Sequence, residues 1–364
     1  LEGNLDLNSW NTGKVQYMER MFEDCESVNN IYLSNWNTEN VRDMQYMFKG
    51  CKKLERITAN ATTSTWNVNN VTKMQYMFNS CLSLKTATLN NWDAGNVDTM
   101  EYMFSDCISL ENINISTWNT LNLRDTRYMF SNCMALKTVI AMSSQGNFTT
   151  ANVENMSYMF TDCQNVTTFT LNNWDTRKAE KMQSLFSGCS AIMSMDLSSW
   201  VTSARTLGDN KEKDQEMMFN NCTALRSLNL YEWILGQKVV SMFNNCTSLQ
   251  TNTFNIARVK TNACTDMSNM FAACESLTSL NLVSSGEYWD VSNVTRMINM
   301  FRGCKKMRTI NVANWDVRNT TTFINMFTAC EALQGINLES WNNNWYKDGI
   351  NLDSMFSYCK KLTN

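Results

Sequence analysis

The stretch Val41-Arg42-Asp43-Met44-Gln45-Tyr46-Met47-Phe48-Lys49-Gly50-Cys51-Lys52-Lys53-Leu54 contains the pattern that decides the fold. A phenylalanine, usually preceded by methionine and always followed three residues later by cysteine, returns along the whole chain. These anchor phenylalanines are Phe22, Phe48, Phe78, Phe104, Phe130, Phe160, Phe186, Phe219, Phe243, Phe271, Phe301, Phe327 and Phe356. Their basic spacing is 26 residues, with longer steps of 30 after Phe48, Phe130 and Phe271. Self-similarity at this period is typical of a solenoid, in which each repeat buries its apolar face on its neighbours.

Each repeat predicts a short helix followed by a short strand. Counted from the phenylalanine, apolar residues recur at positions −7, −4, 0 and +3, as in Val71, Met74, Phe78 and Cys81. Steps of three and four residues place these side chains on one face of a helix or 3₁₀ segment. Apolar residues at +6, +9 and +11 then alternate as in a strand. A tryptophan at +14 is usually followed by Asn or Asp, which we expect to cap the next helix.

The repeats resemble a known class. The run Leu110-x-x-Ile113-x-Ile115 is similar to a leucine-rich repeat. Asn293-Val294-Thr295-Arg296-Met297-Ile298-Asn299-Met300-Phe301-Arg302-Gly303-Cys304 resembles, almost letter for letter, the BspA-like repeats of bacterial and protist surface proteins. This resemblance covers essentially the whole chain. It implies an α/β fold, a leucine-rich-repeat-like right-handed solenoid of about 13 turns, with one short parallel β-strand and one short helix or 3₁₀ segment per turn. It also implies a surface, adhesion or interaction role.

Composition narrows the classes of partner. Of the 364 residues, 43% are hydrophobic, yet there is no long apolar run, so we expect no membrane span. A net charge of −3 without a basic stripe disfavours nucleic acid and anionic membranes as partners. Because a solenoid adds length without adding domains, we expect a single domain over residues 1–364. Both ends fall inside the repeat pattern, which indicates a fragment of a longer chain whose signal and anchor lie outside it.

The cysteines at position +3 allow three interpretations: disulfides between turns, metal ligands, or a buried ladder of thiols. Every turn contributes one cysteine at the same phase, without Cys-x-x-Cys pairs or any histidine, which favours the buried ladder. We therefore expect no disulfide and no metal. The structural cysteine ladder consists of Cys25, Cys51, Cys81, Cys107, Cys133, Cys163, Cys189, Cys222, Cys246, Cys274, Cys304, Cys330 and Cys359.

Catalytic chemistry is poorly represented. The chain has no histidine, the side chain that most often acts as a general base near neutral pH. Carboxylate pairs such as Glu23 and Asp24 occur at positions that vary between repeats, as a solvated surface does. Glycine-rich phosphate-binding loops are missing from the sequence. The sequence predicts that the protein is not an enzyme and needs no cofactor.

A tyrosine precedes the anchor phenylalanine by two residues in five consecutive repeats. If the segment is helical, this position lies about 160° from the phenylalanine, so the rings would face outward. An exposed aromatic row could contact sugars or a partner protein, or the rings could lie flat on neighbouring turns and shield the backbone. This tyrosine column, our candidate binding site, consists of Tyr46, Tyr76, Tyr102, Tyr128 and Tyr158.

Positions +8 and +10 should face outward from the strands. They are rich in threonine, asparagine and serine, which indicates either an ordinary sheet surface or, remotely, a flat ice-binding face. The residues are Thr86 and Thr88, Asn112 and Asn114, Thr168 and Thr170, Ser227 and Asn229, Ser279 and Asn281, and Thr309 and Asn311.

Inserted loops are a third candidate for recognition, because loops on a rigid scaffold often carry binding. They cover residues 60–65, 142–147, 203–216 and 283–288. Glycosylation sequons are also frequent, but several recur at a fixed repeat phase and so follow from the Asn- and Thr-rich repeat. Asn60 and Asn147, in inserted loops, are the better glycosylation candidates if the source is eukaryotic and the protein is secreted.

Together these observations predict a non-enzymatic extracellular or cell-surface interaction and adhesion module whose partner is a protein or glycan surface. The alternative is a structural subunit of an extracellular fibre, sheath or particle coat, which self-associates through the solenoid ends or the tyrosine column. Ice binding remains a remote third possibility.

Overall fold

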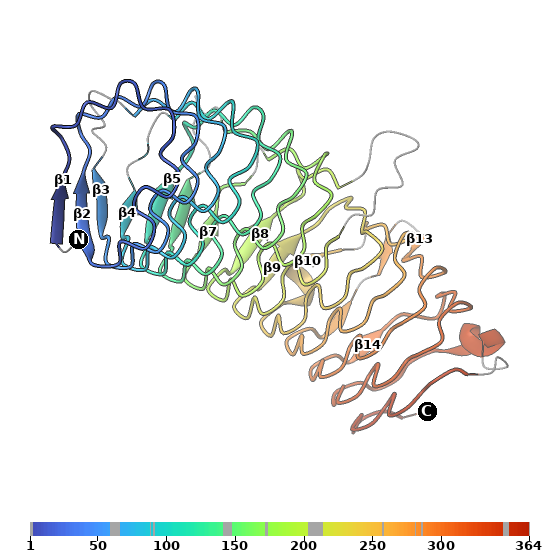
Figure 1. Cartoon of the computed structure of the whole chain (residues 1–364). Helices are drawn as coiled ribbons and strands as arrows, with labels where there is room; N and C mark the ends of the chain where they lie inside the picture. The colour runs from blue at the N-terminus through green and yellow to red at the C-terminus, as the bar shows by residue number, and fades with distance from the viewer. Residues whose placement is uncertain are drawn as a thin grey trace. The chain divides into compact units, whose positions relative to one another are not determined.

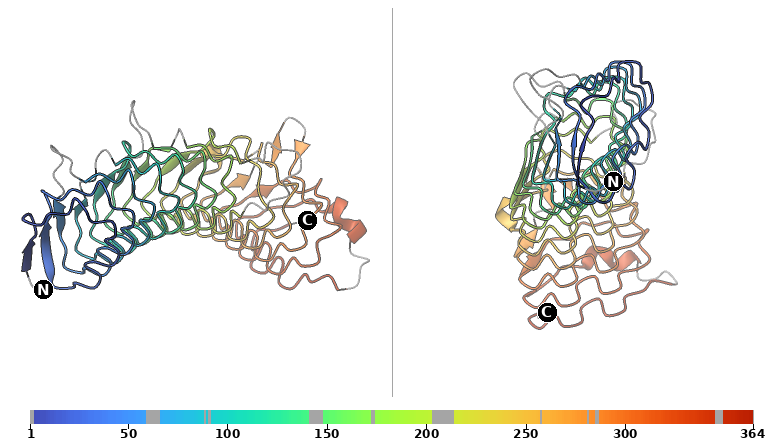
Figure 2. Two further views of the ribbon diagram at one scale, coloured as in Figure 1. Left: turned by 45° about the horizontal axis from the view of Figure 1, so that its top comes forward. Right: turned by 60° about the vertical axis from the view of Figure 1, so that its left-hand side comes forward.

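The computed structural model describes residues 3–58, 66–87, 89, 92–140, 148–171, 174–202, 214–256, 258–280, 282–284, 287–344 and 349–363. It divides into two compact units, Leu1–Ala179 (unit 1) and Glu180–Asn364 (unit 2). In each unit the chain winds into successive turns that stack one on the next (Figure 2). The expectation of a single domain stays a prediction.

Unit 1 contains one parallel sheet, whose strands after the first are built from the alternating residues that follow a ladder cysteine. Its strands pair in sequence order and lie side by side in Figure 1. Opposite residues come from the same repeat phase, as in the pairs Asn112–Thr138 and Ile113–Val139. The strands are β1 (Gly3–Asp6), β2 (Val28–Tyr32), β3 (Arg56–Thr58), β4 (Thr86–Ala87), β5 (Asn112–Asn114), β6 (Thr138–Ile140) and β7 (Thr168–Phe169).

Unit 2 repeats this arrangement with interruptions. β8 (Ser194–Asp196), β9 (Ser227–Asn229) and β10 (Phe254–Asn255) form one parallel sheet. β11 (Ser279–Leu280) pairs in parallel with β14 (Thr309–Ile310). Between them, β12 (Val283–Ser284) and β13 (Glu287–Tyr288) pair antiparallel within one of the expected loops. Two 3₁₀ segments, η1 (Thr251–Thr253) and η2 (Glu339–Asn344), also belong to this unit.

The apolar periodicity marks the core of each unit. Leu110, Ile113 and Ile115 are at most 3% exposed. Anchor phenylalanines of neighbouring turns stack on one another, as Phe104 and Phe130 do, with ring centres 5.5 Å apart. The tryptophan of one turn donates from its indole nitrogen to a carbonyl of the turn before, as Trp118 Nε1 does to Leu89 O at 2.7 Å.

The helix expected around each phenylalanine is wrong. Residues at positions −2 and +2 have a left-handed backbone, with φ between 53° and 75° in every repeat, so no α-helix can run through them. Alternate N–H groups instead donate to the next turn, as Tyr46 N does to Gln75 O and Phe48 N does to Met77 O, both at 2.9 Å. Lys49 N donates back to Tyr46 O at 3.1 Å, which closes a tight turn within the repeat. The segment is therefore a ribbon of turns that is hydrogen-bonded laterally, like a second sheet.

The observed fold class and number of turns differ from those expected from the sequence. The described residues form a parallel β-solenoid with almost no helix, so the α/β class and one helix per turn are wrong. Over the described residues the solenoid has about ten turns, so the expected 13 are not matched exactly. The strand expected in each repeat is confirmed for most turns.

The polar residues after each tryptophan do not cap helices. Asn37 Oδ1 accepts a hydrogen bond from Glu39 N at 2.9 Å and so closes a turn. Thr38 Oγ1 donates across to Asn67 O of the next turn at 2.8 Å. In the same region Asn96 Nδ2 donates to Asn69 O at 2.6 Å. These side chains connect neighbouring turns and add to backbone bonds in the same region, such as that from Asn119 N to Trp92 O at 3.0 Å.

None of the described helical segments is long and apolar enough to cross a membrane.

Candidate functional site: the tyrosine column

The left-handed backbone at position −2 places the five tyrosines on the laterally bonded ribbon of unit 1. All five are half-buried. Their rings stack face to face along the column, with ring centres 4.4 to 4.9 Å apart and planes within 10° of parallel. This spacing follows the distance between neighbouring turns, which the backbone bonds set. The structure thus brings together the whole predicted column.

The stacked geometry decides which part of each ring a partner can meet. Because the faces of neighbouring rings cover one another, a sugar cannot lie flat on a face within the column. Ring edges and hydroxyl groups remain as the contact surface. This matches the expectation that the rings lie flat on neighbouring turns more closely than that of an open aromatic platform.

A cluster of charges covers the first ring of the column. The guanidinium carbon of Arg20 lies 4.1 Å from the centre of the Tyr46 ring, and Lys49 Nζ lies 5.3 Å from it. Glu23 connects the two cations, accepting from Arg20 at 2.7 Å and from Lys49 at 3.3 Å. Arg20 occupies position −2 of its own repeat, so it continues the tyrosine column with a cation. Sequence reasoning missed this residue, although its repeat phase was a readable signal.

Charged neighbours also surround the middle of the column. Tyr76 Oη donates to Glu101 at 3.3 Å, and Arg127 binds the same carboxylate at 2.6 Å. Burial raises the pKa of the Tyr76 hydroxyl well above its usual value, and the negative charge of Glu101 adds to the shift. Burial also raises the pKa of Tyr102, assisted by neighbouring Tyr128 and Glu101. The hydroxyls therefore stay protonated and can donate hydrogen bonds at neutral pH.

The ladder cysteines are buried, except that Cys25 and Cys359 are half-buried. Cys107 Sγ donates to the carbonyl oxygen of Phe78 in the preceding turn at 3.2 Å, and that oxygen also accepts from Cys81 N. Burial raises the pKa of the Cys51 and Cys246 thiols to about 12. Such thiols are poor nucleophiles and poor metal ligands at neutral pH. The same sulfur-to-phenylalanine bond, at 3.1 to 3.2 Å, forms at Cys51, Cys81, Cys133, Cys163, Cys222, Cys246, Cys274, Cys304, Cys330 and Cys359.

The polar ladder on the strands bonds largely to itself. Thr138 Oγ1 donates to Asn112 Oδ1 at 2.7 Å, and Asn30 Nδ2 donates to Asn4 Oδ1 at 2.7 Å. Asn114 Oδ1 accepts from both the amide and the hydroxyl of Ser116. Thr88 and Asn281 lie outside the described residues. These bonds direct the polar hydrogens along the sheet, which favours an ordinary sheet surface over a face that matches ice.

Most inserted-loop residues and both preferred glycosylation candidates, Asn60 and Asn147, lie outside the described residues. Several other sequon asparagines use their side-chain nitrogen structurally. Asn70, Asn293 and Asn319 each donate from Nδ2 to a carbonyl of the preceding turn at 2.7 to 2.9 Å. Their recurrence therefore reflects a role in joining turns.

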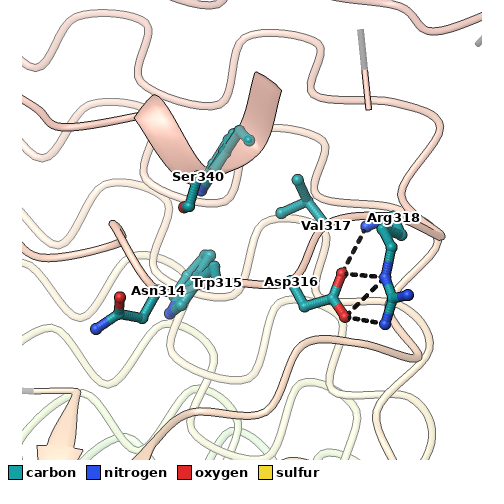
Figure 3. A pocket seen from close by; sticks show the side chains of 7 residues that line it. Asn314, Trp315, Asp316, Val317, Arg318 and Ser340 are labelled. Carbon is teal, nitrogen blue, oxygen red and sulfur yellow. Dashed lines mark hydrogen bonds and ion pairs between the residues drawn. The ribbon is translucent and has the colours of Figure 1, made fainter. Parts of the chain in front are cut away.

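A pocket in unit 2 lies beside the stacked indoles of Trp315 and Trp341 (Figure 3). Asp316 and Arg318 face each other across two-pronged hydrogen bonds of 2.6 to 3.0 Å. Both indoles are at most 1% exposed, so the pocket offers a closed ion pair and no open aromatic surface. In the described part of the chain, no group of three or more His, Cys, Asp or Glu side chains could hold a metal ion.

The fold defines a repeat protein, a parallel β-solenoid whose outward rows of side chains change from turn to turn. The chain belongs to the family described as Mycoplasma protein of unknown function, DUF285, whose model matches residues 2–64, 54–144, 138–255 and 265–364. The narrower resemblance to BspA-like repeats stays a prediction.

Two solved structures similar to this chain are described as leucine-rich proteins. A leucine-rich repeat protein from Bacteroides ovatus is 18% identical, with 99% of this chain and 91% of that chain covered and a TM-score of 0.44. A leucine rich cell surface protein from Faecalibacterium prausnitzii is 15% identical, with 96% and 91% covered and a TM-score of 0.43. No curated protein matches the chain.

Proposed function

We propose that the chain is a non-enzymatic interaction and adhesion module that acts outside the cell or at its surface and binds a protein or glycan. The observation that carries this proposal concerns position −2, where the backbone conformation is the same in all repeats but the side chain changes. Position −2 has the same left-handed backbone in every repeat, yet it holds tyrosine in five consecutive turns of unit 1 and mostly asparagine or serine in unit 2. Asparagine adopts this backbone more easily than tyrosine, so the fold itself does not require the column.

The chemistry of the column supports a broad contact surface. Tyrosine side chains recur at the spacing of the turns, and acidic and basic side chains such as Glu101 and Arg127 lie beside them. A rigid row of this kind offers repeated hydrogen bonds to sugar hydroxyls or to the polar groups of a protein surface. Tyrosine also contributes large contact area at a low cost in side-chain entropy.

The absence of catalysis is part of the proposal. The chain lacks histidine, and ladder thiols such as Cys51 and Cys246 are buried with a raised pKa. Neither an activated nucleophile nor a base near neutral pH is therefore evident among the described residues.

The test uses beads coated with the full chain and intact cells, before and after treatment of the cells with glycosidases or proteases. Wild-type beads should adhere, and the enzyme that removes adhesion identifies a glycan or protein partner. The triple variant Tyr76→Asn/Tyr102→Asn/Tyr128→Asn should lose adhesion at least tenfold. Asn269→Ser/Asn299→Ser, changed at the same phase in unit 2, is the matched control. Equal adhesion of the triple variant, with an unchanged circular dichroism spectrum, would remove the column from the binding site.

A structural subunit of an extracellular fibre, sheath or coat is the second candidate. It is favoured by the exposed apolar side chains of Ile108 and Met134, which lie in adjacent turns of unit 1.

A further inference from the structure

Three consecutive turns of unit 1 carry an apolar residue at position +4, just before the strand. Leu82 is half-buried, and Ile108 and Met134 are 37% and 40% exposed. We call these three side chains the apolar ridge. The ridge lies in different columns from both the tyrosine column and the sequence-predicted sheet face.

Other repeats show that the fold does not need apolar residues at this position. In unit 1 the preceding turns have Glu26 and Lys52, which form an ion pair of 2.8 Å. In unit 2 the same position forms the pairs Glu275–Lys305 at 2.6 Å and Glu331–Lys360 at 3.0 Å. The ridge is therefore a local departure from a position that holds charged or polar residues in the other turns.

The surroundings of the ridge allow close approach by a flat surface. Position +5 beside it holds the small residues Ser83, Ser109 and Ala135. Ala135 N donates to Ile108 O at 3.1 Å, so the backbone under the ridge belongs to the lateral ladder. The surface that a partner would contact is therefore already formed, and binding would require little further ordering of the polypeptide chain.

A row of four exposed charges runs parallel to the ridge at position +7. Along successive turns it reads Glu55, Lys85, Glu111 and Lys137. Lys85 lies 3.2 Å from Glu55, and Lys137 lies 2.8 Å from Glu111. The signs of the charges alternate along the row. If a second copy of the row runs in the opposite direction, each negative charge of one row therefore lies opposite a positive charge of the other.

We propose that unit 1 binds a second copy of this chain through the apolar ridge and this charged row, with the two copies antiparallel about a two-fold axis. In that arrangement Glu55 faces Lys137 of the second copy, and Lys85 faces its Glu111. Ile108 then meets Leu82 of the second copy, and Met134 lies opposite its Lys52. All contacts occur twice, as in an isologous dimer. A partner of uniform charge gains nothing from an alternating row, which is why the second copy is the occupant that fits.

The two parts of the surface have different roles. Burial of the ridge supplies the attraction, whereas exposed ion pairs contribute little affinity and mainly select the register. Three apolar side chains cover far less area than a standard interface of roughly 1,600 Å², so the dimer is weak. Many copies arranged on a surface or along a fibre would reinforce it through multivalency.

The first test is sedimentation velocity of the full chain over a concentration series. Wild type should show a reversible monomer–dimer equilibrium, and Ile108→Lys should weaken it at least tenfold. Two other repeats already have a lysine at position +4, Lys52 and Lys305, so the variant should fold normally. Thr247→Lys, at the same position in unit 2, is the matched control and should dimerise like wild type. A wild type that stays monomeric at millimolar concentration overturns the proposal.

A charge-reversal experiment tests the register. The quadruple variant Glu55→Lys/Lys85→Glu/Glu111→Lys/Lys137→Glu keeps an alternating row, so it should still form homodimers. Mixed with wild type it places like charges opposite each other, so heterodimers measured by fluorescence energy transfer should be at least fivefold fewer than homodimers. Equal formation of heterodimers contradicts the antiparallel register. Loss of dimers in the tyrosine triple variant but not in Ile108→Lys would place the contact on the tyrosine column and overturn the proposal.

Discussion

Arg20 stacks on Tyr46: its guanidinium carbon lies 4.1 Å from the ring centre, on the face turned away from Tyr76. The arginine has a φ of 56°, the left-handed value shared by the tyrosines. The aromatic column therefore begins with a cation at the same repeat phase. Its outermost ring has both faces covered.

Replacing Arg20 with glutamine should loosen the first turns. The guanidinium is about half exposed, so its cation–π contact with Tyr46 contributes only a small stabilisation. We expect faster hydrogen exchange at the Tyr46 amide by a factor of about 2 to 5. Arg42→Gln, which removes an exposed arginine with no ring contact, should leave exchange unchanged. Identical exchange in both variants would show that the stack contributes nothing.

Tyr102→Asn should destabilise unit 1. Tyr102 stacks on Tyr76 at 4.6 Å and on Tyr128 at 4.4 Å, and each contact contributes about 0.5 to 1.5 kcal/mol beyond burial. Relief of the left-handed backbone strain returns about 1 kcal/mol, so a net loss of about 1 kcal/mol is expected in urea denaturation. The reverse change, Asn299→Tyr in unit 2, has no tyrosine neighbours and should not stabilise. A stabilising Asn299→Tyr would mean that strain at this position is negligible.

The ladder thiols should resist alkylation in the folded protein. Burial raises the pKa of Cys51 and Cys246 to about 12, so almost no thiolate exists at pH 8. Mass spectrometry after iodoacetamide treatment should find label first at the half-buried Cys25 and Cys359. In urea all fourteen cysteines should react. Rapid labelling of Cys107 in the native protein would contradict its burial.

Acid should weaken the cluster at the start of the column. Burial opposes ionisation of Glu23, but hydrogen bonds from Arg20 and Lys49 outweigh it, so the pKa is lowered from its ordinary value of 4.5. A carboxyl whose folded-state pKa is lowered adds stability above its unfolded pKa and loses it as pH falls through the folded pKa. The free energy of unfolding should therefore drop between about pH 5 and pH 3, and Glu23→Gln should flatten part of that drop. Glu39→Gln, at an exposed site, is the control, and equal curves for the two variants would exclude Glu23 as a source.

The repeat pattern correctly predicted which side chains are buried, but it did not predict the backbone conformation around each phenylalanine. Val71, Met74, Phe78 and Cys81 are all completely buried, as their spacing required. That spacing of three and four residues also fits a ribbon of tight turns, which explains why the helix was wrong. A contrary signal was present, because glycine or asparagine recurs at +2 in Gly50, Asn132 and Gly188 and favours a left-handed backbone.

The sequence predicted only that the five tyrosines occupy the same position in successive repeats. Tyr46 and Tyr76 differ by one repeat, so their neighbourhood followed from the period alone. Whether the rings would turn their faces outward or toward each other depended on the backbone angle at position −2. The left-handed backbone, misread as helical, brings the ring planes within 10° of parallel.

The sequence by itself determined the period, the buried residues and the strand positions, because each repeat contributes the same apolar side chains at the same phase. Only the tertiary structure decided that N–H groups such as that of Phe48 bond to the next turn, since a hydrogen bond between repeats has no local signature. It also decided which surfaces face solvent. Lateral bonding aligns equal positions of successive turns, so tyrosines cover tyrosines and the charges of Glu55, Lys85, Glu111 and Lys137 become one alternating row.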